Sequence, residues 1–295
     1  MNTLRLQICL GFLLLLLSKS GFATSGQEAA LSEQSQKMAD KHRKKIKAEI
    51  GKLKDHEWAG NYYKGDGLGE NVSFSIAPQS GYVFEWHGCL GLYGLNYGAA
   101  AWTNDRIHLS FQFENKPGFG GIAPEFVPVS WNSRHYLVPA DDVVGFCNAV
   151  NLGGEPRMNV YGSYLLRDGD EKKSAAGFPE LPVQYRPYLL EKPIEAAILK
   201  VGPFTLRPSI STWKFKDTPV TLDAGTNKGL LVGMELVVTQ PPHIVKSVRL
   251  THVQADHSEG IMDQAGEEEP GPKVGWRLST RAPWYDVIRG QKGSR

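Results

Sequence analysis

The run GYVFEWHGCLGLYGLNYGAAAWTNDRIHLSFQF spans residues 81–113 and holds three aromatic-rich segments that glycines separate. Apolar side chains take every second position of two segments: Tyr82, Phe84 and Trp86 in the first, and Ile107, Leu109, Phe111 and Phe113 in the last. A period of two residues is typical of a strand with one buried face. The run therefore predicts the centre of an antiparallel β domain.

Similar short runs on both sides extend this domain over residues 57–176. Alternating segments begin at Trp58 and at Asn71, and two further strands are predicted on either side of residues 132–133. Residues 140–151 follow a helical period, so we expect one helix with Asp141 or Asp142 near its N-terminus. The glycine-rich segment at residues 65–69 is followed by a strand pattern, which indicates a turn rather than a phosphate-binding loop.

A second β module is expected over residues 194–283, where six short apolar runs alternate with turn residues. This spacing predicts a small β-barrel. Between the modules, residues 177–193 contain four prolines, which remove backbone donors and hold the chain extended. Aromatic and leucine residues within this segment favour an ordered connector over a loose linker. We expect residues 284–295 to form a flexible tail.

The fold class follows from these segments. We predict a mainly β protein with an N-terminal helix, an antiparallel β barrel or sandwich that carries one helix, and a small C-terminal β-barrel.

Residues 1–23 have the organisation of a signal peptide, with Arg5, an apolar core from Leu6 to Leu17, and small residues at Gly21 and Ala23. The apolar run is about 12 residues, short of the roughly 20 that span a bilayer. We therefore expect cleavage near Ala23 and a periplasmic or secreted protein with no transmembrane segment after processing. A retained anchor is the alternative, and lipidation at Cys9 is a second one.

Residues 24–56 predict a basic amphipathic helix. Its narrow apolar stripe consists of Leu31, Met38, Ile46, Ile50 and Leu53, and lysines dominate the remaining positions. One interpretation is attraction to an anionic membrane surface or polymer. We favour a solvated helix that packs its stripe on the β domain or on a second copy, because the polar face also carries Asp40 and Glu49. Self-association through this helix stays open.

Net charge excludes one class of partner. The chain has 33 Lys and Arg residues against 31 Asp and Glu, and without residues 1–23 the numbers are 31 and 31. Proteins that bind nucleic acids derive most of their affinity from a basic face. We therefore expect no nucleic-acid partner.

Two segments carry family resemblances. The G-x-x-x-G-[LV]-x-x-G-M motif at residues 225–234, with the hairpin VKSVRLTHVQADHSEGIM, resembles small β-barrels of the rod-shape-determining MreC proteins and of flagellar ring proteins. That resemblance covers residues 213–280 and implies scaffolding rather than catalysis, although the long coiled coil of MreC is missing. Residues 58–151 resemble secreted bacterial proteins of unassigned function, and the Trp-x-Gly-x-Tyr opening is similar to that of lipocalin-type barrels.

Cys89 and Cys147 are the two cysteines that remain after export. In an oxidising compartment they predict a disulfide, and two separate buried thiols are the alternative. A metal site from His87, Cys89, His135 and Cys147 is a further alternative, but only His-x-Cys has local ligand spacing. We expect neither a metal nor another cofactor. Asp66, Asp168 and Asp170 lie in glycine turns that lack the calcium-loop pattern, and we interpret them as solvated.

No catalytic frame is visible in the sequence. It contains neither G-x-S-x-G nor H-E-x-x-H. A hydrolase that uses His87 and His135, or a nucleophilic Cys89 beside His135, would need residues that meet only in three dimensions.

Aromatic residues among glycines supply the candidate binding site. Tyr and Trp offer flat faces with a polar edge. Most of them are expected in the core, whereas Tyr93, Tyr97 and Trp102 are the surface candidates for a glycan or apolar ligand. We therefore expect a non-catalytic secreted or periplasmic envelope protein that binds or scaffolds another envelope protein or a glycan. A lipocalin-like binder of small ligands or glycans and a hydrolase are the alternatives.

Overall fold

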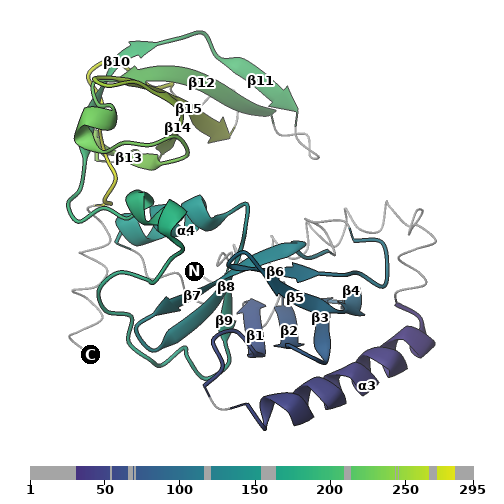
Figure 1. Ribbon diagram of the computed structural model, residues 1–295. Coiled ribbons are helices and arrows are strands. Elements are labelled where there is room, and N and C mark those ends of the chain that lie inside the picture. The colour runs from purple at the N-terminus through teal and green to yellow at the C-terminus, as the bar shows by residue number, and fades with distance from the viewer. Residues whose placement is uncertain are drawn as a thin grey trace, which may run out of the picture. The chain divides into compact units, whose positions relative to one another are not determined.

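A computed structural model describes residues 31–53, 55–65, 69, 71–115, 121–153, 164–208, 214–242, 244, 246–265 and 271–282. The protein is mainly β, as predicted, with a nearly closed nine-stranded sheet and a closed six-stranded barrel (Figure 1). The expected signal peptide (residues 1–23) and tail (residues 284–295) lie outside the described residues. Among the described helices, none combines the length and apolarity needed to cross a membrane.

The first sheet has the strand order β4-β3-β2-β1-β9-β8-β7-β6-β5. Its strands are β1 (Gly60–Gly65), β2 (Asn71–Ala77), β3 (Gly81–Gly88), β4 (Gly91–Gly98), β5 (Ala100–Thr103), β6 (Arg106–Leu109), β7 (Glu125–Trp131), β8 (Arg134–Pro139) and β9 (Leu165–Arg167). The ladders with a determined register are all antiparallel. In the β7–β8 hairpin Trp131 lies opposite Arg134, and Asn132 takes a φ of 54° in the turn, a left-handed conformation that asparagine tolerates.

The first sheet curls because the chain around Gly98 pairs on both of its edges, with β3 on one side and with the segment after β6 on the other. Up to Gly98, β4 pairs with β3. Around Gly98 the other edge of the chain is paired as well, because Ser110 N donates to Ala99 O (3.0 Å) and Gln112 N to Tyr97 O (3.2 Å). A Cβ atom on Gly98 would lie 1.9 Å from Ser110 O, and one on Gly81 would lie 1.9 Å from Gly98 O. The crossing therefore requires glycines.

A buried asparagine reinforces the same junction. Asn96 is 3% exposed, and its Oδ1 accepts hydrogen bonds from Gln112 N (3.0 Å) and Phe113 N (3.3 Å). Its Nδ2 donates to Phe113 O (3.1 Å). The side-chain amide thus replaces a backbone amide and carries the ladder past the end of β6.

The predicted basic helix is α3 (Glu33–Ile50), which lies along β2 and β3 in Figure 1. Ser32 caps its N-terminus through a hydrogen bond from Ser35 N. Ala39 and Ile46 are fully buried in a cluster with Ala77, Val83, Leu95 and Tyr97. The predicted stripe was wrong at Met38, which is 41% exposed, because the buried face is centred one position further along, on Ala39.

Polar contacts fix the helix in this place. The Glu49 carboxylate accepts hydrogen bonds from the backbone N–H groups of Gln79 (2.9 Å) and Ser80 (2.7 Å) in the β2–β3 turn. Arg43 forms an ion pair with Glu85 on β3 (2.6 Å). The helix therefore packs on the β domain, as favoured from its sequence.

The second predicted helix, α4 (Val143–Asn151), covers part of β7 and β8. Its fully buried Phe146 and Cys147 join a cluster with Val129, Tyr136 and Val138. Asp142 is the N-cap residue, although its side chain makes no capping hydrogen bond. On β8, Tyr136 and Val138 face this helix, whereas His135 and Leu137 lie on the opposite face of the strand.

The second sheet has the order β10-β16-β13-β14-β15-β12-β11, and a β10–β12 ladder closes its first six strands into a barrel. Its strands are β10 (Glu195–Val201), β11 (Thr205–Pro208), β12 (Lys214–Leu222), β13 (Glu235–Gln240), β14 (Ser247–Val253), β15 (Ser258–Ala265) and β16 (Arg277–Ser279). Fully buried side chains such as Leu222, Leu230, Met234 and Leu236 fill it. The six predicted runs correspond to the barrel strands, while β11 lies outside the closed ring.

The short helix η1 (Val183–Tyr188) lies between the two sheets in the sequence, and η2 (Thr226–Lys228) precedes β13. The prediction of an extended chain over residues 177–193 was wrong at η1, where one short helix includes Pro187. The chain divides into two compact units, one of residues 1–61, 65–102 and 108–124, and the other of residues 62–64, 103–107 and 125–295. The expected module boundaries at residues 176 and 194 stay predictions.

The glycine crossing can be tested by substitution. Gly98→Ala is expected to lower the free energy of unfolding by at least about 2 kcal/mol, because Cβ overlaps Ser110 O and the strands must separate. Gly51→Ala is the control, since Gly51 has helical φ (−63°) and an added Cβ would lie 3.5 Å from its nearest neighbour. Urea unfolding followed by circular dichroism measures both. Equal stability of Gly98→Ala and the parent would contradict the crossing.

Candidate functional site

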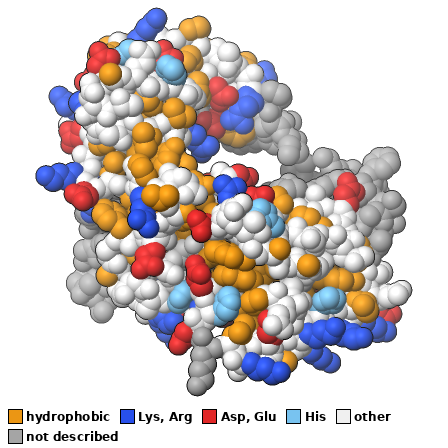
Figure 2. Space-filling model, in the orientation of Figure 1, with side chains coloured by type: hydrophobic (Ala, Val, Ile, Leu, Met, Phe, Trp, Pro, Cys, Tyr) orange, Lys and Arg blue, Asp and Glu red, His pale blue; other side chains and the backbone are white. Residues whose placement is uncertain are grey.

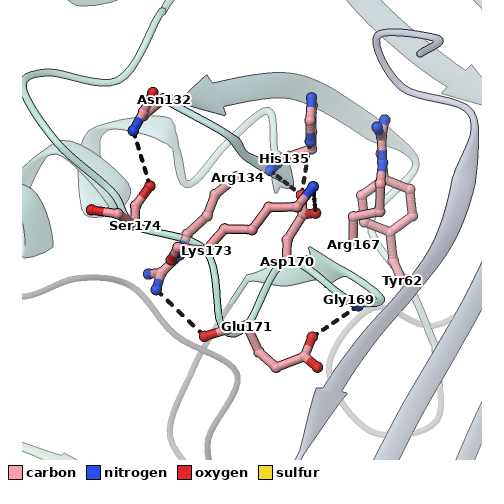
Figure 3. A network of polar contacts seen from close by, with 10 residues as sticks. All are labelled: Tyr62, Asn132, Arg134, His135, Arg167, Gly169, Asp170, Glu171, Lys173 and Ser174. Atoms are coloured by element: carbon pink, nitrogen blue, oxygen red, sulfur yellow. Dashed lines mark hydrogen bonds and ion pairs between the residues drawn. The ribbon is translucent and has the colours of Figure 1, made fainter.

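His135 and Asp170 form the centre of a polar network at the start of β8 (Figure 3). Asp170 Oδ2 accepts two hydrogen bonds of 2.8 Å, one from the backbone N–H of His135 and one at His135 Nδ1. Lys173 Nζ lies 2.5 Å from the other carboxylate oxygen, Oδ1. The Asp170 side chain is 2% exposed and that of His135 is 26% exposed. The network thus joins a buried acid to a partly exposed imidazole.

The turn after β9 places Asp170 in this position. Gly169 has a φ of +88°, a conformation that favours glycine, and its N–H donates to Glu171 Oε2 (2.8 Å). Asp170 N donates to Arg167 O, and Lys173 N donates to Asp170 O, both at 3.0 Å. These bonds turn the chain back, so that the Asp170 carboxylate lies within hydrogen-bond distance of the backbone N–H of His135.

A buried guanidinium ties the same turn to the β7–β8 hairpin. Arg134 is 3% exposed, and its Nε donates to Lys173 O (2.5 Å). A second nitrogen of Arg134 reaches Glu171 O at 3.5 Å, and Asn132 Nδ2 donates to Ser174 O at 3.3 Å (Figure 3). The loop over residues 168–174 is therefore fastened to the hairpin by several bonds.

Charge stabilises the ionised form of the acid. Burial by itself raises the pKa of Asp170, but hydrogen bonds from Lys173 and His135 outweigh burial and bring the pKa below its usual value. Asp170 is thus a carboxylate at neutral pH.

An imidazole held at Nδ1 by a carboxylate keeps Nε2 for other contacts, the arrangement that general bases use. In this protein the same carboxylate also accepts the His135 N–H and the Lys173 ammonium. These additional bonds have a direct structural purpose, because the His135 N–H joins the loop to the hairpin and the Lys173 ammonium closes the loop on itself.

Next to this network, Arg167 on β9 lies opposite Tyr62 on β1. Two Arg167 nitrogens donate to the Tyr62 hydroxyl at 3.1 and 3.3 Å, and the guanidinium carbon lies 5.6 Å from the centre of the ring. Figure 3 shows the two side chains alongside His135. The guanidinium of Arg167 therefore links β9 to β1 through the Tyr62 side chain.

Trp102 is the sequence-predicted aromatic residue that the structure leaves exposed. It lies on β5, is 42% exposed, and faces the buried Trp58 with ring centres 6.3 Å apart and planes 15° apart. Two backbone N–H groups, of Trp58 and Ala59, donate to His56 Nδ1 at 3.3 and 3.1 Å. The turn that carries Trp58 is thereby fixed, so the outer ring lies on a rigid support.

The other two predicted binding aromatics do not join Trp102. Tyr97 is 8% exposed, and its ring stacks on His42 of α3 at 4.9 Å and meets the edge of Phe113 at 5.6 Å. The prediction of a surface position was wrong for Tyr97, because α3 covers that strand. Tyr93 is half-buried, with its ring 5.1 Å from that of Trp86.

No disulfide joins Cys89 to Cys147, so the predicted covalent bond is absent from the structure. Cys147 is fully buried among apolar side chains under α4, whereas Cys89 is exposed in the turn between β3 and β4. Burial raises the pKa of Cys147 to about 12, which keeps it a thiol. The sulfur of Cys147 packs in this apolar cluster, so it is not available to the exposed Cys89.

The structure places His87 on β3, exposed, and His135 on β8, which are separated by β2, β1 and β9 in the sheet order. Among the residues that the structure describes, no group of three or more His, Cys, Asp or Glu side chains could hold a metal ion. The alternative set of His87, Cys89, His135 and Cys147 is not gathered there.

Sequence analysis missed Asp170, which it assigned to a solvated turn and which is 1% exposed. It also missed Arg134 and Trp58 as supports. The segment RDGDEKK offers several charged residues in succession, and only the path of the turn decides which one folds inward.

Comparison with known proteins gives no match: no family model, no curated protein and no solved structure is similar to this chain. The resemblances to the MreC barrel and to lipocalin-type openings therefore stay predictions.

Substitution of the buried acid tests its structural role. Asp170→Asn is expected to lower the free energy of unfolding at pH 7 by about 2–4 kcal/mol, since bonds to a charged acceptor are lost. The folded pKa is lowered from 3.8, so the advantage of the parent is complete well above pH 3.8 and declines as pH falls through the folded pKa. Urea unfolding between about pH 2 and pH 7 measures this.

Asp168→Asn is the matched control in the same turn. Burial and then Glu171 raise the pKa of Asp168, so removal of its charge is expected to leave stability at pH 7 unchanged or slightly higher. A loss of stability for Asp170→Asn that does not shrink below pH 3.8 would contradict the assigned role of the carboxylate.

Thiol labelling tests the cysteine assignment. In the chain without residues 1–23, iodoacetamide without reductant is expected to modify Cys89 in the folded state and both Cys89 and Cys147 after denaturation. Mass spectrometry of the intact chain counts the labels. Two thiols that stay unlabelled after denaturation without reductant would show that a disulfide exists.

Proposed function

We propose that the protein is a non-catalytic binding protein of the periplasm or the extracellular space, exported with removal of residues 1–23. Its β modules bind or scaffold an envelope component, either a glycan or another protein. The observation that carries this proposal is Trp102, an exposed indole that lies parallel to the buried Trp58.

The surroundings of Trp102 suit contact with a partner. β5 ends the sheet order, and its sequence Ala-Ala-Trp-Thr contains no charged residue. Edge strands of monomeric proteins usually carry charges or prolines that prevent pairing. Its neighbours Ala100 and Ala101 have small side chains, and the flat face of an exposed indole fits the apolar side of a sugar ring or an extended peptide.

The interior of the first sheet favours surface binding over the lipocalin-like alternative. Phe74, Ile76, Tyr82 and Phe84 are each at most 2% exposed, on the face of β2 and β3 opposite α3. The rings of Phe74 and Tyr82 lie 5.6 Å apart. Such packing supports a filled core rather than a ligand cavity.

The hydrolase alternative has less support. The Asp170 carboxylate is shared among three donors that fasten a loop, and His87 belongs to a distant strand of the sheet order. Both observations favour a structural role for the polar groups.

Trp102→Ala tests the proposal, with Leu90→Ala as the control at another exposed apolar residue (67% exposed) of the same unit. We expect the exported parent to sediment with insoluble cell-wall glycan, and Trp102→Ala to bind at least about tenfold more weakly, while Leu90→Ala binds as the parent does. A second measurement replaces Ala101 by a photo-crosslinking amino acid in the exporting cell and assays for a protein partner.

Glycan binding that Trp102→Ala abolishes supports a glycan partner. A crosslink to one envelope protein that Trp102→Ala abolishes supports a protein partner. If Trp102→Ala changes neither measurement, the proposed binding surface is wrong.

A further inference from the structure

The outward side of α3 carries a concentration of exposed lysines. We name as the lysine face five exposed residues of α3 and the turn after it: Lys41, Lys44, Lys45, Lys47 and Lys52. Figure 2 shows blue side chains gathered over this helix, along the lower right edge of the view. The chain without residues 1–23 has balanced charges, so this concentration is local.

The acidic residues of the helix are occupied elsewhere. Glu33 pairs with Lys37, Asp40 pairs with Arg43, and Glu49 accepts the N–H groups of the β2–β3 turn. No acidic partner of the lysine face is found within the described part of the chain. The five ammonium groups therefore project a positive field into solvent.

A neighbouring histidine is affected by that field. Burial and then the charges of Lys45 and Lys41 lower the pKa of His42. His42 lies at the inner side of the helix, where it stacks on Tyr97. The lysines thus repel a further positive charge even beneath the helix.

The apolar side of α3 is already used. Ala39 and Ile46 are buried against the sheet, and Met38 is the large apolar side chain that α3 exposes. An amphipathic helix that enters a bilayer needs a wide free apolar face. Contact with a membrane through this helix would therefore be limited to charged headgroups.

We propose that the lysine face docks this protein on the anionic phospholipid headgroups of a membrane surface. Lys44 and Lys45 follow Lys41 by three and four residues and Lys47 follows Lys44 by three, so these four ammonium groups lie close together on the outward side of α3, and Lys52 follows in the turn. A compact cluster of cations on a helix that is fixed to the sheet is complementary to a surface of anionic headgroups. This inference rests on the proposed export, because the predicted signal peptide of residues 1–23 precedes α3 in the sequence and export brings the helix to a membrane surface.

Vesicle sedimentation tests the proposal with the exported protein, whose N-terminus is determined beforehand. We expect binding to vesicles of phosphatidylglycerol and phosphatidylcholine, and no binding to phosphatidylcholine alone. Binding should be lost between about 0.05 and about 0.5 M NaCl, as screening shortens the range of the field.

The test variant is Lys41→Gln/Lys44→Gln/Lys45→Gln, for which we expect about 100-fold weaker partitioning into anionic vesicles. The control is Lys200→Gln/Lys228→Gln/Lys273→Gln, which removes the same charge from exposed positions of the barrel. It should bind as the parent does. All variants keep the same N-terminus, and circular dichroism melting confirms their fold.

Three outcomes would overturn the proposal. The first is equal vesicle binding by the two triple variants, and the second is binding that ignores lipid charge. The third is retention on a soluble polyanion such as heparin without any binding to anionic vesicles, which would assign the lysine face to an anionic polymer.

Discussion

The junction at residues 96–98 and 110–113 is the contact on which the first β domain depends. Ser110 and Gln112 donate backbone hydrogen bonds to Ala99 and Tyr97, and the Asn96 amide extends this ladder by three further bonds. Two strand backbones come so close here that neither Gly81 nor Gly98 has room for a Cβ. Only in this way can one continuous segment pair with β3 along its first half and with β6 along its second half. The aromatic core on β2 and β3 then lies on the inner side of a curled sheet.

Each surface feature of interest starts where a strand leaves such a ladder. Beyond Ala99 the chain continues as β5 and carries Trp102 outward. Beyond β9 the turn folds back and places the Asp170 carboxylate where it accepts the backbone N–H of His135. On the outside of β2 and β3, the turn at Gln79 and Ser80 supplies the N–H groups that hold Glu49, and so fixes α3 with its lysines outward. Strands and a helix that are held by hydrogen bonds therefore set the positions of the exposed Trp102 indole and of the lysine face.

Local alternation was enough to predict most strands, because a half-buried strand repeats every two residues whatever its neighbours are. It identified all six strands of the barrel and the helix positions of α3 and α4. Alternation failed where a helix packed on the sheet decides which side chains are buried. Tyr97 looked like a surface residue in a glycine-rich bend, but α3 covers it, and Met38 was assigned to a stripe that is rotated by one residue.

Long-range pairing was beyond the sequence for a similar reason. Two cysteines in an exported chain predict a disulfide, yet one of them belongs to a buried helix and the other to a surface turn. Asp170 accepts hydrogen bonds from His135, and Trp58 supports Trp102, only because of the direction of the turns that carry them. No residue pattern in the sequence predicts that direction. β11 escaped prediction because its described side chains are exposed, Leu206 among them, so the strand has no buried face that alternation could reveal.

Amide hydrogen exchange at Ser110 and Gln112, followed residue by residue by nuclear magnetic resonance, tests the closure most directly. If the two backbone bonds and the Asn96 amide close the sheet, these N–H groups exchange as slowly as those in the middle of the β2–β3 ladder. Rapid exchange at Ser110 and Gln112, with the β2–β3 ladder protected, would mean that the sheet is open and that closure does not organise this domain.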